Sequence, residues 1–181
     1  MLILGMTVLA AQAKPDNPDY PDYVVENKVL VKYRGHETDV VIPPRLGIDR
    51  IGPRAFAGVP VNSVIIPMGV GFIDERAFMG CSFLKTVRLP NTLSTLGRRV
   101  FFNCFMLETI NIPRSLRSIE DGAFFNCRSL KEMDLPGTLR SLGSRAFSGC
   151  AAIQKLSLSR RTTLGQNPFM GVPPQAITWK D

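Results

Sequence analysis

The sequence predicts an α/β-type solenoid of about six repeats of 22–23 residues, with a parallel β-sheet on one face and short turns or helical turns on the other. One phenylalanine recurs at near-constant spacing, and a short alternating apolar run precedes each recurrence. A unit of this length cannot bury its apolar face alone, so it stacks on its neighbours. The period therefore favours binding along an extended face over catalysis in a pocket. The spacings are 22, 23, 23, 23 and 22 residues between Phe56, Phe78, Phe101, Phe124, Phe147 and Phe169.

The composition is that of a folded domain with a basic surface. The 181 residues are 45% hydrophobic and 20% charged, which is ordinary for a folded protein. The formal net charge of +7 favours acidic partners, such as anionic glycans, lipid head groups, nucleic acid or acidic proteins, and selects none of them. A surface that is basic for solubility alone is the simpler interpretation.

The first residues resemble a secretory signal. An apolar run ends in Ala11-Gln12-Ala13, a small-residue cleavage pattern, so residues 1–13 are predicted to be a signal peptide. A basic stretch before that run is missing, which indicates either a truncated start or a partial resemblance. Residues 14–23 carry prolines among aspartates and are predicted to be an extended linker. No later run reaches transmembrane length, so the mature chain is expected to have no membrane span.

Two strand-like runs, VVENKVLVKYRG and TDVVIP, follow the linker. Residues 24–43 are therefore predicted to form a β-rich cap over the first coil, because the end coils of a solenoid need covering. Residues 44–181 are predicted to form the solenoid itself.

The first half of each repeat is a half-buried strand with a period of two, as in SVIIP, TVRLP and TINIP. A proline follows five of these strands and ends the pairing at a common level, since it has no N–H to donate. Alternation turns the middle residue of each strand outward. These middle residues are Val41, Ile65, Arg88, Asn111, Asp134, Ser157 and Thr178.

The second half of each repeat holds the recurring phenylalanine and, in four repeats, a cysteine three positions later. In-register neighbours lie about 4.8 Å apart, whereas a disulfide needs Cβ atoms at about 3.8 Å. The cysteines are therefore predicted to be free, buried thiols in the same core as the phenylalanines, namely Cys81, Cys104, Cys127 and Cys150.

The segments LPNTLSTLGRRVFFNCFMLETINIP and IPRSLRSIEDGAFFNCRSLKEMDLP combine these features in one order. They resemble the BspA-like class of leucine-rich repeats over about Val24 to Asp181. The resemblance implies a right-handed leucine-rich repeat solenoid without catalytic residues, in surface or secreted proteins that adhere and bind proteins. Four positions depart from the repeat pattern: Val59 and Val172 replace the cysteine, Gly122 interrupts a row of arginines, and Ser159 replaces a proline.

No catalytic or metal-binding pattern stands out. The sequence lacks nucleophile-elbow, P-loop and dinucleotide-binding motifs, and His36 is its single histidine. CxxC and HxxxH spacings are absent as well. The protein is therefore predicted not to be an enzyme and to need no cofactor or metal.

Two surfaces are candidate binding sites. The first is the outward side of the central strands, with Arg88, Asn111, Glu132 and Asp134; freely varying solvated residues are the alternative. The second is a basic edge two residues before the phenylalanines, where stacked guanidiniums would grip carboxylates or sulfates or pair with acidic residues of neighbouring coils. The basic edge consists of Arg54, Arg76, Arg99 and Arg145.

The favoured function is a non-enzymatic, secreted or cell-surface module that binds a protein on a host or neighbouring cell and mediates adhesion. A structural scaffold or spacer in a surface assembly is one alternative, and a basic surface for anionic glycans is another. The sequence disfavours nucleic acid as a partner, because no aromatic residues interleave with the arginines for base stacking and export would remove the target.

Overall fold

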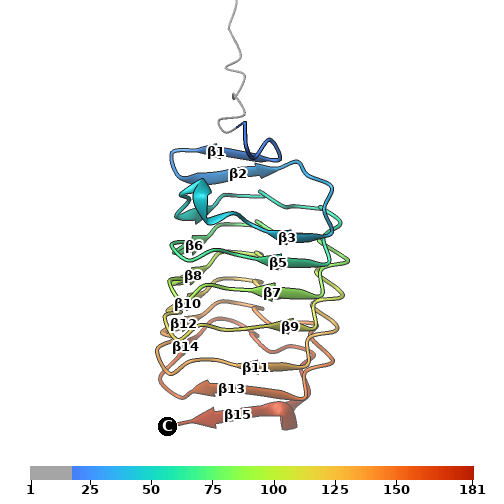
Figure 1. The fold of residues 1–181 in the computed structure, drawn as a ribbon. Helices are drawn as coiled ribbons and strands as arrows, with labels where there is room; N and C mark the ends of the chain where they lie inside the picture. Colours follow the sequence, from blue (N-terminus) through green and yellow to red (C-terminus); the bar gives the residue numbers. More distant parts are fainter. Residues whose placement is uncertain (1–17) are drawn as a thin grey trace, which may run out of the picture.

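The computed structural model describes residues 18–181, which form a solenoid of stacked coils (Figure 1). The predicted signal peptide at 1–13 and the start of the predicted linker lie outside the described residues. A hairpin of β1 (Tyr23–Glu26) and β2 (Val29–Tyr33) begins the described fold, and β2 pairs in parallel with β4 (Arg50–Ile51) of the first coil. The predicted solenoid is thus confirmed.

The predicted face strands form two parallel sheets instead of one. The four-stranded sheet contains β3 (Asp39–Val41), β5 (Ser63–Ile65), β7 (Thr86–Arg88) and β9 (Thr109–Ile110). The three-stranded sheet contains β11 (Glu132–Asp134), β13 (Lys155–Ser159) and β15 (Ile177–Lys180). All seven lie above one another along one side of the solenoid (Figure 1), and we call their outward surface the sheet face.

A further sheet occupies a second side of the coils, where the sequence analysis expected only turns. It has eight strands in the order β1-β2-β4-β6-β8-β10-β12-β14, of which β6 to β14 are labelled down the left edge of Figure 1. Its coil strands have two residues each, too few for an alternating pattern to be recognised. The remaining members are β6 (Phe72–Ile73), β8 (Thr95–Leu96), β10 (Ser118–Ile119), β12 (Ser141–Leu142) and β14 (Thr163–Leu164).

The predicted helical turns, and with them the α/β class, are wrong. The only helices in residues 18–181 are two short 3₁₀ segments, η1 (Pro44–Leu46) and η2 (Pro174–Ala176). In the turn from Arg99 to Cys104, Arg99 and Asn103 have φ of 53° and 59°, and Phe101 N–H donates to Ala123 of the next coil at 2.8 Å. An α-helix needs consecutive right-handed residues bonded within the segment. Neither helix is long and apolar enough to cross a bilayer.

The segment from Arg99 to Cys104 has a counterpart around the recurring phenylalanine of every coil, and we call this segment the Phe turn. Its phenylalanines stack into one column inside the solenoid. Five of them are fully buried, with centroids of successive rings 4.9–5.4 Å apart. Phe169 is half-buried at the end of the column, 6.4 Å from Phe147, and Tyr33 continues the column at the other end, 4.8 Å from Phe56. The aromatic column therefore joins the hairpin to the last coils.

Replacing Phe101 with alanine should lower the free energy of unfolding by about 3–5 kcal/mol, because it opens a cavity in the middle of the column. Phe83 is 54% exposed and provides the control; its replacement by alanine should change the free energy by no more than about 0.5 kcal/mol. Urea unfolding followed by circular dichroism measures both. Equal losses in the two variants would contradict the role of the column.

Candidate functional site

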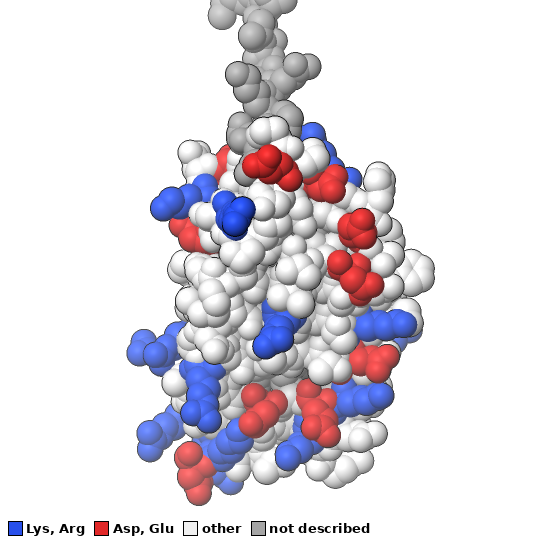
Figure 2. All heavy atoms as spheres, viewed as in Figure 1, with Lys and Arg blue, Asp and Glu red and all other residues white. Residues whose placement is uncertain are grey.

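The sheet face changes character along the solenoid. Val41, Ile65 and Arg88 lie side by side in the ladder, and the two apolar members are 60% and 39% exposed. Asp134, Ser157 and Thr178 occupy the same column in the later coils. Figure 2 shows a broad uncharged area across the upper-middle coils and many charged side chains around the lower ones. This column of the sheet face thus changes from apolar to polar along the solenoid.

A break separates the two face sheets between β9 and β11. At the corresponding place in other coils, the ladder is continuous: Lys85 N–H donates to Asn62 O at 2.8 Å, Glu108 N–H to Lys85 O at 2.9 Å, and Gln154 N–H to Lys131 O at 2.8 Å. Within residues 18–181, no such bond joins Lys131 N–H to Glu108 O, and β9 has no ladder partner in β11. We call this gap the break.

Asn111 directly follows β9 beside the break and departs from the ladder on the side that faces β7. In other coils the backbone carbonyl at this position accepts a hydrogen bond, as Arg88 O does from Ile66 N–H at 3.0 Å. Here the side-chain amide takes over: Leu89 N–H donates to Asn111 Oδ1 at 2.7 Å, and Asn111 Nδ2 donates to Leu89 O at 2.9 Å. β9 ends at Ile110, directly before Asn111, and has no pairing with β11.

A hollow of about 510 Å³ lies at the break on the sheet face. An ion pair between Glu108 and Lys131 spans it at 3.5 Å, with both side chains well exposed. Such a pair contributes little stability, because water screens exposed charges. Thr109, Ile112 and Glu132 also line the hollow, so it combines apolar, hydroxyl and carboxylate groups.

Asp134 lies between this hollow and a second hollow of about 350 Å³ in the three-stranded sheet. Its carboxylate accepts hydrogen bonds from Lys180 Nζ and Ser157 Oγ. These bonds, from Lys180 first, lower the pKa of Asp134 below its ordinary value. The carboxylate is therefore charged at neutral pH and held in place.

The structure brings together three of the four predicted sheet-face residues. Asn111, Glu132 and Asp134 line the hollow of the break, whereas Arg88 lies outside it. Asn111 and Asp134 are engaged within the protein, which the sequence analysis did not foresee. Within residues 18–181, Glu132 and Arg88 form no ion pair and leave their charges available to a partner.

Each arginine of the basic edge is the first residue of a Phe turn. The four arginines all have positive φ, between 53° and 57°. Arg76 pairs with Glu75 at 3.4 Å, and the Arg99 guanidinium lies over the Phe102 ring at 5.6 Å. Asp74 pairs instead with Arg50, at 2.7 Å. Of the four arginines of the basic edge, only Arg76 thus forms an ion pair with an acidic residue within residues 18–181.

The cysteines are free and buried in the core beside the phenylalanines. Each thiol lies close to a carbonyl of the preceding coil, as Cys81 Sγ does to Phe56 O at 3.0 Å. Burial raises the pKa of Cys81 to about 12 and raises the pKa of Cys104 and Cys127 well above the ordinary value. These thiols are therefore unreactive at neutral pH. No three His, Cys, Asp or Glu side chains in residues 18–181 gather closely enough to hold a metal.

Sequence reasoning missed several residues of these surfaces. Lys180, Glu108 and Lys131 became visible only in three dimensions, because their partners lie one or two coils away along the stack. Tyr33, which extends the buried column of phenylalanines, was also missed, because the hairpin lies outside the repeat pattern.

Comparison with known proteins identifies the repeat. A family model described as BspA type leucine rich repeat region matches residues 49–173 in six copies. None of the curated proteins matches the chain.

Solved structures of bacterial leucine-rich repeat proteins share the fold. The T. pallidum leucine-rich repeat protein is 27% identical, with a TM-score of 0.72 over 88% of this chain and 87% of that one. A leucine-rich repeat protein from Bacteroides ovatus is 22% identical (TM-score 0.68, 80% of this chain and 42% of that one). A leucine rich cell surface protein from Faecalibacterium prausnitzii is 23% identical (TM-score 0.68, 87% and 52%). The chain spans about half of the last two, whose likeness shows the fold alone.

The buried thiols predict a loss of stability at alkaline pH. Folding raises the pKa of Cys81 from about 9 to about 12, so its contribution to stability is complete below about pH 9 and is lost as the pH rises toward 12. Replacing Cys81 with alanine should make the decline between about pH 10 and 11 shallower by about 1.4 kcal/mol per pH unit. Urea unfolding at a series of pH values measures this slope.

Val59 occupies the cysteine slot of the first coil and provides the matched control. Its replacement by alanine removes apolar contact without a titrating group, so stability should fall equally at every pH. If the Cys81→Ala variant has the slope of the unmodified protein, the thiol does not titrate as a buried group.

Proposed function

The chain belongs to the BspA-type leucine-rich repeat family, and we propose that it is a non-enzymatic protein-binding module that is secreted or displayed at the cell surface and mediates adhesion. Leucine-rich repeat proteins are generally protein-interaction modules. The proposed binding site is the sheet face, centred on the break between β9 and β11. The break carries the proposal because it is where this sheet departs from the uniform ladder.

Unpaired backbone groups favour a polypeptide partner. Backbone N–H and C=O groups need hydrogen-bond partners wherever water is excluded. The facing edges of β9 and β11 lack each other as partners, so a bound protein that covers the break must supply them. Backbone or amide groups of a partner provide both donors and acceptors for this purpose, whereas an apolar ligand provides neither.

The apolar end of the sheet face supports the same proposal. Exposed Val41 and Ile65 adjoin Arg88, whose guanidinium is free of ion pairs in residues 18–181. Protein interfaces typically combine an apolar centre with arginine and a polar rim. Glu132 supplies an unpaired negative charge on the other side of Asn111, so a partner with complementary charges is held in one orientation.

The location at the cell surface rests on two observations. The apolar run that ends in Ala11-Gln12-Ala13 has the pattern of a secretory signal. The similar F. prausnitzii protein is described as a cell surface protein. A catalytic role is not proposed, because Asn111 and Asp134, the two polar groups best held in the break, are already engaged by Leu89 and by Lys180 and Ser157.

Replacing Arg88 and Glu132 together with alanine should abolish capture of the specific partner and leave the free energy of unfolding within about 0.5 kcal/mol, as is usual for exposed sites. The measurement is quantitative capture from extracellular-matrix and cell-surface extracts at about 0.1 M and 1 M salt. A partner is a protein that the unmodified chain retains and the double variant loses.

The matched control replaces Arg117 and Glu26 with alanine, which also removes one positive and one negative exposed charge but lies away from the sheet face. This control should retain the partner. If both double variants capture the same proteins as the unmodified chain, the sheet face is not the binding site and the scaffold function is the better account.

A further inference from the structure

The basic edge contains one conspicuous gap. Every Phe turn from Arg54 to Arg145 begins with a residue in the left-handed conformation, and four of these five residues are arginine. The left-handed region suits glycine far better than a residue with a side chain. Only Gly122, with φ of 60°, meets that preference, so the row of guanidiniums is interrupted between Arg99 and Arg145.

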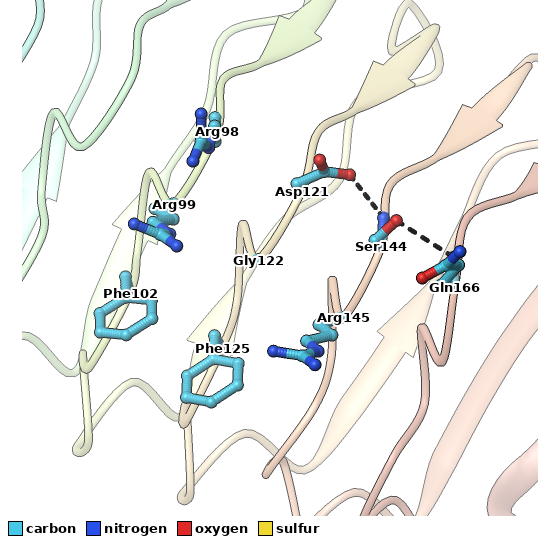
Figure 3. A pocket seen from close by; sticks show the side chains of 9 residues that line it. All are labelled: Arg98, Arg99, Phe102, Asp121, Gly122, Phe125, Ser144, Arg145 and Gln166. Atoms are coloured by element: carbon cyan, nitrogen blue, oxygen red, sulfur yellow. Dashed lines mark hydrogen bonds between the residues drawn. The ribbon is translucent and has the colours of Figure 1, made fainter.

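The missing side chain leaves a hollow of about 390 Å³, which we call the Gly122 hollow (Figure 3). A Cβ atom at Gly122 would lie 3.4 Å from Arg99 Cγ and 3.8 Å from Phe125 Cβ. An arginine at this position, as in the other coils, would therefore extend into the hollow. The Gly122 hollow exists because this coil departs from the repeat.

Two aromatic rings line one side of the hollow. Phe102 and Phe125 follow the buried phenylalanines and are half-exposed, with ring centroids 4.9 Å apart and planes 6° from parallel. Figure 3 shows the two rings next to each other, with Arg99 above Phe102 and the Arg145 side chain reaching toward Phe125. An apolar surface thus lies between two guanidiniums.

The guanidiniums here lack carboxylate partners. Arg98, Arg99 and Arg145 line the hollow, and none of them forms an ion pair in residues 18–181. The one carboxylate in the lining, Asp121, is engaged by Ser144 N–H at 2.6 Å. Three cations against one acid leave the hollow electropositive.

We propose that the Gly122 hollow binds an acidic sugar, a uronate or sulfated residue of an oligosaccharide, with its anionic groups on Arg99 and Arg145 and its ring on Phe102 and Phe125. Guanidiniums hold carboxylates and sulfates through paired, charge-assisted hydrogen bonds. The C–H-bearing face of a pyranose packs on the electron-rich face of an aromatic ring. This site lies on the Phe turns and is separate from the proposed protein-binding sheet face.

The spacing favours an oligosaccharide over an acidic peptide. Arg99 and Arg145 begin Phe turns two coils apart, which corresponds to about 10 Å along the solenoid. A short acidic oligosaccharide with charges on successive units bridges that span while its rings cover the phenylalanines. A poly-glutamate peptide would place carboxylates on the arginines but has no flat apolar face to set between them.

The test uses the full-length chain with three probes: a heparin tetrasaccharide, a hyaluronan tetrasaccharide and a short poly-glutamate peptide. Binding of each is measured by calorimetry near physiological salt. One or both sugars should bind. Arg99→Gln and Arg145→Gln should each weaken that binding about tenfold or more, as loss of a charged hydrogen-bond partner does. Gly122→Arg should also weaken it at least tenfold although it adds a positive charge, because it fills the hollow.

The matched control is Arg54→Gln, which removes the same charge from the same row outside the hollow and should leave binding unchanged. Thermal unfolding of each variant checks the fold. If Gly122→Arg binds the sugars as tightly as the unmodified chain, or Arg54→Gln weakens binding as Arg99→Gln does, net charge accounts for binding and the site is refuted. If poly-glutamate binds more tightly than both sugars, the ligand is not an acidic sugar. If none of the three probes binds, the proposal is refuted outright.

Discussion

Vertical stacking of the same residue in every coil is the constraint on which the rest of the structure depends. The buried phenylalanines lie about 5 Å apart, close to the spacing of hydrogen-bonded strands, so the column and the ladders have a common repeat. Each Phe turn also donates its amides to the next coil, as Phe124 does to Ala146 at 2.8 Å. Apolar burial and backbone pairing therefore impose the same register, and a change in one disturbs the other.

The two candidate sites lie beside residues that depart from the repeat. Asn111 uses its side-chain amide where other coils use backbone, and the sheet face opens beside it. Gly122 lacks the arginine of its row, and a hollow forms over two aromatic rings. The eight-stranded sheet and the aromatic column remain continuous past both positions, through β10 and β12 and through Phe101 and Phe124. The eight-stranded sheet and the aromatic column keep the coils stacked, so changes of single surface residues do not disrupt the solenoid.

The period and the alternating strands were sufficient to predict the solenoid and the places of the face strands, because both depend on side chains that repeat. The helical turns were wrong because apolar residues three apart suit a tight turn as well as a helix, and only the positive φ at residues such as Asn103 distinguishes the two. The interruption at Gly122 was visible in the sequence, but its hollow was not. The break was unpredictable, since an outward Asn111 looks like any solvated strand residue until its amide is seen on Leu89.

Amide hydrogen exchange in the native protein tests the central claim most directly, because it compares the same position in successive coils. The amides of Lys85, Glu108 and Gln154 are bonded to the preceding coil and should be protected. The amide of Lys131 has no such bond in the described chain and should exchange much faster, while Phe101 and Phe124 on either side stay protected in the column. Protection of Lys131 equal to that of Lys85 would show a continuous ladder and contradict the break.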